Sequence, residues 1–228
     1  MRGKLAIRYL LMAVFAVLAS AAMAADIVTL PTANQLKADQ LEIAYYRLDL
    51  DFKNSAAPGK ANLTTVYWGI TDRLELDAWW YDPEKGGSDL ALNASFLVIP
   101  EGEVMPAVVV GAQDITTALP TGKLSWYAAA AKNVIVSEAR RFFPVVRLHG
   151  GVGTKQNNGI FGGVQALVTR NLGAVVLYSS NEALLGGRNW ITGLTYTFSQ
   201  TPLVLKLGTL GRHSWFGAAY TISLPPSR

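Results

Sequence analysis

Two histidines, His149 and His213, are the residues of this sequence best suited to acid–base chemistry. A membrane-embedded lipid hydrolase of this size needs a serine two residues from a histidine, because side chains two apart on a strand share a face and can act as nucleophile and base. Position 151 is instead glycine and position 215 is tryptophan. Ser214 is adjacent to His213 and therefore points to the opposite face of a strand. The sequence predicts no catalytic residue and a protein that is not an enzyme.

The remaining motifs predict neither a metal site nor a cofactor. Two distant histidines without a carboxylate cluster make a poor metal site, and there are no cysteines to add thiolate ligands or disulfides. The run Gly150–Lys155 (GGVGTK) lacks the spacing of a phosphate-binding loop, and no helix pattern follows it. We expect the other strand glycines to serve curvature or close packing.

One set of polar residues alternates with apolar neighbours along several segments, as expected on one face of strands. Arg73, Glu75 and Asp77, for example, alternate with Leu74, Leu76 and Ala78. Two interpretations stay open: the polar set lines a water-filled lumen and sets its charge selectivity, or its members pair and fill a narrow interior. The candidate lumen-lining residues are Arg73, Glu75, Asp77, Asn93, Arg147, His149, Gln165 and Lys206.

About twelve strands carry these residues, with ten as the fallback count. The tight hairpin 61–82 shows the pattern best, since only Thr71-Asp72-Arg73 separates its two strands. Long and short connections alternate with few exceptions, as in outer-membrane barrels, and an even strand count puts both termini on the periplasmic side. The sequence therefore predicts an all-β fold: a closed antiparallel up-and-down transmembrane β-barrel. The facing of the first strand, about 40–51, and the structure of 133–144 stay open.

Aromatic residues at the strand ends support a barrel that crosses a bilayer, since amphipathic rings favour both membrane interfaces. Three tryptophans fall at outer ends, and one tryptophan and one phenylalanine at inner ends. The candidate aromatic belts are Trp80, Trp126 and Trp190 outside, and Trp68 and Phe198 inside.

Length and composition agree with an exported barrel. The chain has 228 residues, half of them apolar, yet no internal run is long enough for a spanning helix. Residues 1–24 have the pattern of a secretory signal, 25–39 are a periplasmic lead-in, 40–224 the barrel and 225–228 a short tail. The signal holds three of the 20 basic residues, and 20 − 3 = 17 against 16 acidic residues leaves a charge near +1, so we expect no nucleic-acid partner.

Two short stretches resemble known families. Residues 217–222 (GAAYTI) are similar to the C-terminal signal of bacterial outer-membrane barrels, although LPPSR follows from Leu224 where the family has a terminal aromatic. The resemblance implies that Gly217, Tyr220 and Ile222 are an assembly signal for the barrel-assembly machinery. Residues 30–33 (LPTA) and the hairpin 69–76 (GITDRLEL) resemble the YjbH-type group of exopolysaccharide-associated outer-membrane proteins, with Asp39 replacing a glycine usual there.

These observations favour a bacterial outer-membrane barrel that contacts membrane lipid and acts as a narrow porin-like channel or as a structural or assembly component of the envelope. Three alternatives are kept: an exopolysaccharide-associated outer-membrane factor with a polysaccharide partner, a barrel enzyme acting on lipid or polysaccharide, and a secreted soluble β-sandwich.

Overall fold

The computed structural model describes residues 30–49, 59–119, 123–137, 139–181 and 190–225; the predicted signal peptide lies outside the described residues. Within these described residues, one short helix, η1 (Lys155–Asn157), interrupts an otherwise all-β structure. Among the described residues, no helix has the length and hydropathy to cross a membrane. The strands are β1 (Gln40–Asp49), β2 (Lys60–Gly69), β3 (Leu74–Pro83), β4 (Asp89–Ile99), β5 (Ala107–Gln113), β6 (Ser125–Val136), β7 (Val145–Gly153), β8 (Gly159–Leu167), β9 (Leu172–Ser179), β10 (Trp190–Thr197), β11 (Leu203–Leu210) and β12 (His213–Ser223).

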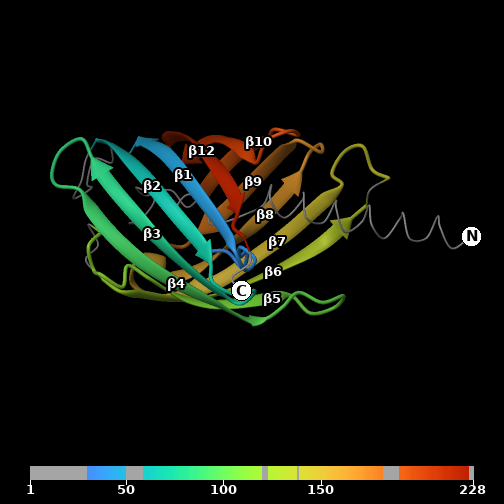
Figure 1. Cartoon of the computed structure of the whole chain (residues 1–228), viewed down its shortest axis with the longest axis horizontal. Helices are drawn as coiled ribbons and strands as arrows, with labels where there is room; N and C mark the ends of the chain where they lie inside the picture. Colours follow the sequence, from blue (N-terminus) through green and yellow to red (C-terminus); the bar gives the residue numbers. More distant parts are fainter. Residues whose placement is uncertain (1–29, 50–58, 120–122, 138, 182–189, 226–228) are drawn as a thin grey trace, which may run out of the picture.

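The twelve strands form one closed barrel (Figure 1). Each strand pairs antiparallel with its neighbours in sequence, and β1 closes the ring with β12 in a register that runs from Gln40↔Ser223 to Leu48↔Trp215. The predicted closed up-and-down barrel of about twelve strands is confirmed. The soluble β-sandwich is wrong, because the sheet has no open edge along which a second sheet would begin.

The outward face of the barrel carries large apolar side chains on every strand. On β3, Leu76 and Trp80 are exposed, whereas Glu75, Asp77 and Trp79 between them are buried. Each of the twelve strands carries at least one exposed large apolar side chain. In water such a surface would be unfavourable, and in hydrocarbon it is the expected one.

The inward face is more apolar than expected from a wet lumen. Aromatic rings on this face lie over glycines of adjacent strands: Tyr127 over Gly111, and Phe161 over Gly151. Trp215 likewise covers Gly193 and Gly208, and Tyr46 covers Gly217. A ring needs a position without a side chain to lie flat against the wall, so these glycines serve close packing.

In segment 133–144, of which the structure describes all but residue 138, β6 ends at Val136 and β7 begins only after the segment, at Val145. β6 continues to Val136 through an irregularity between Asn133 and Ile135, where two residues face one on β7. Such a bulge shifts the alternation of inward and outward side chains by one, which explains why the period-two pattern fades there. A similar register shift lies between Leu97 and Ile99 on β4.

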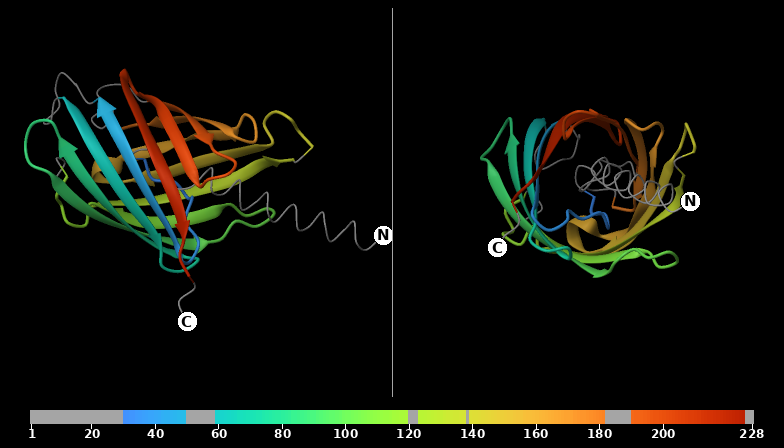
Figure 2. Two further views of the ribbon diagram at one scale, coloured as in Figure 1. Left: turned by 45° about the horizontal axis from the view of Figure 1, so that its top comes forward. Right: turned by 45° about the vertical axis from the view of Figure 1, so that its right-hand side comes forward.

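The two ends of the barrel differ, and we call the end where β1 begins and β12 ends the terminal end, and the other the distal end (Figure 2). Connections at the terminal end span 70–73, 100–106, 137–144, 168–171 and 198–202. Those at the distal end span 50–59, 84–88, 114–124, 154–158, 180–189 and 211–212. The three longest connections are distal, as predicted, but the shortest is distal too, so the alternation of lengths is incomplete.

Candidate functional site: polar groups inside the barrel

The polar set singled out in the sequence lies on the inward rows, with one exception. Arg73 is exposed in the connection 70–73, and its carbonyl accepts a hydrogen bond from Leu97 N at 2.7 Å. The period-two alternation predicted an inward side chain for Arg73, but this residue precedes β3, which begins only at Leu74, so the alternation does not extend to it. The residues on inward positions are Glu75, Asp77, Asn93, Arg147, His149, Gln165 and Lys206.

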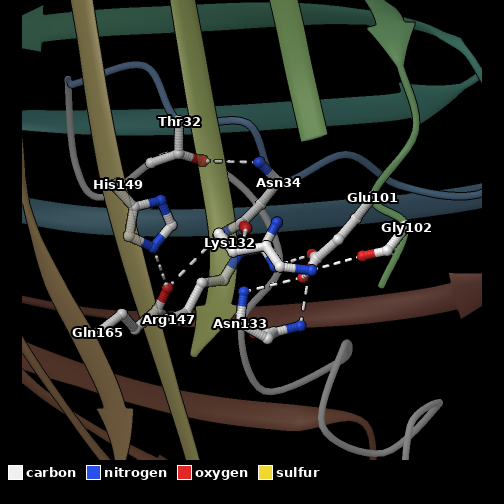
Figure 3. Close-up of polar contacts among 9 residues, drawn as sticks. All are labelled: Thr32, Asn34, Glu101, Gly102, Lys132, Asn133, Arg147, His149 and Gln165. Carbon is white, nitrogen blue, oxygen red and sulfur yellow. Dashed lines mark hydrogen bonds and ion pairs between the residues drawn. The ribbon is translucent and has the colours of Figure 1, made fainter. Parts of the chain in front are cut away.

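At the terminal end, the carboxylate of Glu101 contacts positively charged side chains and a backbone N–H group of β6 and β7 (Figure 3). Its carboxylate accepts a hydrogen bond from Asn133 N at 2.8 Å and forms a direct ion pair with Arg147. Lys132 Nζ lies 3.6 Å from the same carboxylate and also donates to the carbonyl of Gly102. The turn 100–106 is thereby fixed against the neighbouring strands.

These contacts change the ionisation of Glu101. Burial alone would raise its pKa, but the hydrogen bonds from Asn133 and Arg147, together with the positive charges of Arg147 and Lys132, outweigh burial and lower the pKa below its ordinary value of 4.5. Glu101 is therefore an anion at neutral pH, as its role in the ion pair requires.

Arg147 also contacts a segment that the sequence did not place in the lumen. Its Nε donates to Asn34 Oδ1 at 2.8 Å, and Asn34 Nδ2 donates to Gln165 Oε1 at 3.4 Å. His149 Nε2 lies 3.2 Å from the same Gln165 oxygen. The predicted lead-in 25–39 is described from residue 30 onward, and this part of the chain runs inside the ring of strands, drawn in dark blue in Figure 2.

A second group bridges the closing seam of the barrel. Lys206 on β11 lies 3.5 Å from Glu42 Oε1 on β1 and donates to the Tyr46 hydroxyl at 3.1 Å. Thr221 on β12 donates to Glu42 at 3.3 Å. Sequence reasoning found Lys206 but missed Glu42 and Tyr46, because Tyr45-Tyr46 gives the first strand apolar residues on both faces.

Asp77 forms a third group with the neighbouring strand. Asn93 Nδ2 donates to Asp77, and Asn93 Oδ1 accepts from Asp114 N at 2.7 Å. The buried Asp114 carboxylate in turn accepts hydrogen bonds from Ala118 N at 2.8 Å and Leu119 N at 3.2 Å. The group extends from the middle of the wall into the connection 114–124 at the distal end.

A fourth group, of neutral side chains, lies at the distal end. η1 turns inward and buries Gln156 and Asn157, which both donate to Gln113 Oε1 on β5. Asn157 Nδ2 also donates to Ser125 Oγ at 3.2 Å. The sequence pattern TKQNNG indicated only a turn here, since its polar residues gave no signal of burial.

The two histidines have different surroundings. His149 contacts Gln165, while the two carboxylates that would make it a base contact other groups: Asp77 bonds Asn93, and Glu75 accepts from Leu36 N. His213 Nδ1 lies 3.9 Å from Asp49. In the part of the chain that the structure describes, no three metal-ligating side chains gather in one place.

The candidate belt residues all point outward. Trp80, Trp126 and Trp190 are 54%, 60% and 55% exposed at the distal end, so three rings mark that rim. Trp68 and Phe198 are 45% and 38% exposed at the terminal end. Edge-to-face ring pairs extend both groups, with centroids 5.4 Å apart for Tyr178–Trp190 and 5.2 Å for Tyr196–Phe198.

The residues of the candidate assembly signal lie on the closing strand β12. Tyr220 and Ile222 face outward, opposite Ile43 and Leu41 of β1, and Gly217 faces inward under the Tyr46 ring.

No protein-family model and no curated protein matches this sequence. The fold is similar to the KdgM porin (11% identity, TM-score 0.48, covering 79% of this chain and 98% of that one) and to Acinetobacter baumannii Omp33 (7%, 0.49, 81% and 98%). It is also similar to the COG4313 outer membrane channel from Pseudomonas putida F1 (14%, 0.42, 85% and 96%). The closed barrel itself is established by the strand pairing of this chain.

Proposed function

We propose that the protein is a narrow channel in the bacterial outer membrane. The observation that carries the proposal is the contrast between the two faces of one closed sheet: large apolar side chains point outward on all twelve strands, and charged and amide side chains lie inward, beside apolar rings. Aromatic rings at both rims fit the two interfaces of a bilayer. A closed sheet also leaves no unpaired strand edge in hydrocarbon.

The inward groups support a narrow, weakly selective pathway. Glu42 faces Lys206 and Glu101 faces Arg147, so their opposite charges largely cancel along the wall. A pathway lined by such pairs should pass small solutes with little preference for anions or cations.

Planar-bilayer recording on purified, refolded protein tests this proposal. We expect discrete current steps and a reversal potential near zero in a salt gradient. The matched control is the same protein heated before addition, which should give no steps. Absence of steps from the folded protein over many insertions would refute the channel.

A second candidate is a structural or assembly component of the envelope. It is favoured by the extent to which the inner charges are paired and by the chain segment that runs inside the barrel. Folded protein that resists extraction without detergent but never conducts would support this function over the first.

The exopolysaccharide-associated role stays a prediction that rests on the resemblance of residues 30–33 and 69–76 alone. Binding of envelope polysaccharide to the refolded barrel would test it.

We also propose that Gly217, Tyr220 and Ile222 direct assembly of the barrel. If so, replacing Tyr220 and Ile222 by serine should lower the amount of barrel in the outer membrane.

A further inference from the structure

The part of the chain that precedes β1 crosses the lumen at the terminal end. Asp39 N donates to Gly69 O of β2 at 3.0 Å, and Asn34 contacts Gln165 of β8. In a closed ring of twelve strands, β8 is six positions from β2 in either direction, so these two attachments lie on opposite sides of the barrel. Residues 32–38, which we call the strap, therefore span the lumen.

Further hydrogen bonds attach the strap to the walls along its course. Leu36 N donates to the buried Glu75 carboxylate of β3 at 2.8 Å, and Gln35 Nε2 donates to Ser95 Oγ of β4 at 2.8 Å. Arg147 of β7 donates to Asn34 at 2.8 Å. Three successive residues of the strap are thus each held by a hydrogen bond to a different part of the wall, which would not be expected of a freely moving segment.

Packing also fixes the strap. A side chain on Gly69 would collide with the carbonyl oxygen of Lys37, so the strap backbone lies directly against the wall at this glycine. Leu36 is 3% exposed and packs with Tyr67. Ala33 belongs to the same buried apolar cluster as Tyr46 and Trp79 of the inner wall.

We propose that the strap is the constriction of the pathway, held in place by Glu75, Ser95 and Arg147. This inference rests on the proposed channel function. A backbone that crosses the lumen divides the cross-section that the barrel wall would otherwise leave open. If the strap left the lumen, the pathway would widen, and the side chains of Glu75 and Arg147 would face the water in it.

Cysteine pairs test where the strap lies, because the native chain has no cysteine. Gln35→Cys with Ser95→Cys should be joined by a short bifunctional methanethiosulfonate reagent in the folded barrel, and mass spectrometry should detect the intramolecular link. In the control pair, Gln35→Cys with Gly150→Cys, the second cysteine faces outward on β7 and should not be linked. Failure to link the first pair, when each single cysteine reacts, would overturn the proposal.

Conductance tests what the strap does. A variant in which residues 32–38 are replaced by glycine and serine at equal length should conduct several-fold more than the native protein, and Glu75→Gln should show more frequent open levels. Linking residues 35 and 95 should hold the current at the native level or below, and reduction should reverse this effect.

The outcomes separate the two proposals. Equal, measurable conductance of the native and strap-replaced barrels would overturn the constriction while the channel function stands. If neither barrel conducts, the channel function fails and the constriction with it, although the link between residues 35 and 95 would still show that the strap occupies the lumen.

Discussion

The Glu42–Lys206 pair shows how single residues hold the closing seam. Both side chains are largely buried, and together they connect β1 to β11 across β12. A buried pair contributes little net stability, but loss of one partner leaves an uncompensated charge, which costs about 3–5 kcal/mol. We expect Lys206→Met to destabilise the barrel by an amount of this order and Glu42→Gln/Lys206→Met to recover most of it.

Urea unfolding in lipid vesicles measures this coupling, with Lys85→Met at an exposed connection as the matched control. If the two single substitutions simply add in the double variant, Glu42 and Lys206 do not interact, and the seam is held by backbone pairing alone.

Glu101 should make stability depend on pH in acid. Because its pKa in the folded barrel is lowered, its contribution is fully present above the ordinary value of 4.5 and is lost as the pH falls through the folded pKa. Glu101→Gln should lose about 1.5–3 kcal/mol at neutral pH, the usual contribution of hydrogen bonds to a charged group.

The measurement is the urea midpoint of the native and Glu101→Gln barrels at pH 7, 5 and 3. Their difference should shrink as the pH falls below 4.5. The exposed Glu103 lies two residues away, and Glu103→Gln should behave like the native protein. A constant difference between the native and Glu101→Gln barrels across the pH range would contradict the assignment.

At the residue scale, the sequence predicted the inward placement of polar groups wherever strand alternation was regular. Asp77 and Asn93 lie opposite each other on β3 and β4, as their period-two positions require. Alternation could not find Asn34 or Glu101, because both lie outside strands and act through contacts with residues far away in sequence. Composition and spacing carry no signal for such contacts.

At the element scale, glycines decide how closely adjacent strands and their side chains approach. A side chain on Gly163 of β8 would lie closer than 3.0 Å to Val176 O and Leu177 of β9, whereas nothing lies within 4 Å of an added group on Gly150 of β7. We expect Gly163→Ala to cost about 1–3 kcal/mol, as overpacking usually does, and Gly150→Ala to be close to neutral.

The two variants form a matched pair, since β7 and β8 are neighbours and the substitution is the same. The fraction of barrel that migrates as the compact form in unheated gels gives folding yield, and urea midpoints give stability. Equal effects at both positions would show that strand flexibility, not packing space, is what these glycines provide.

The presence of the strands could be predicted from the sequence, but the bulges within them could not. The period-two rows 74–80 and 90–98 correspond to β3 and β4 because one face of each meets an apolar environment along its whole length. The bulge at Asn133 reversed the facing within β6, so no single alternation fits residues 133–144. A bulge depends on the pairing with the adjacent strand, which a single segment does not encode.

At the scale of the whole molecule, the sequence predicted closure but not the contents of the barrel. If twelve strands all face hydrocarbon with their apolar rows, no strand edge can stay unpaired, and the sheet must close into a cylinder. The inner wall is more apolar than the sequence led us to expect, because Tyr46, Trp79 and Trp215 lie on the rows that face inward. Tyr46 and Trp215 cover glycines and form an edge-to-face ring pair.

Closure itself is testable through the seam between the first and last strands. Ile43 on β1 lies directly opposite Tyr220 on β12, and both side chains point outward. Directly opposed Cβ atoms in an antiparallel pair are about 4.5–5.5 Å apart, close to the range of a disulfide. Ile43→Cys/Tyr220→Cys should therefore form an intramolecular disulfide on mild oxidation, and only in the folded barrel.

The control pair is Ile43→Cys/Val176→Cys, in which the second cysteine faces outward on β9, away from β1 in the ring. It should stay reduced under the same conditions. Because the native chain has no cysteine, any disulfide reports on these positions alone. If the first pair does not oxidise while the compact form persists in gels, the seam is open. The apolar rows would then need a partner other than lipid, and the membrane-spanning barrel would have to be abandoned.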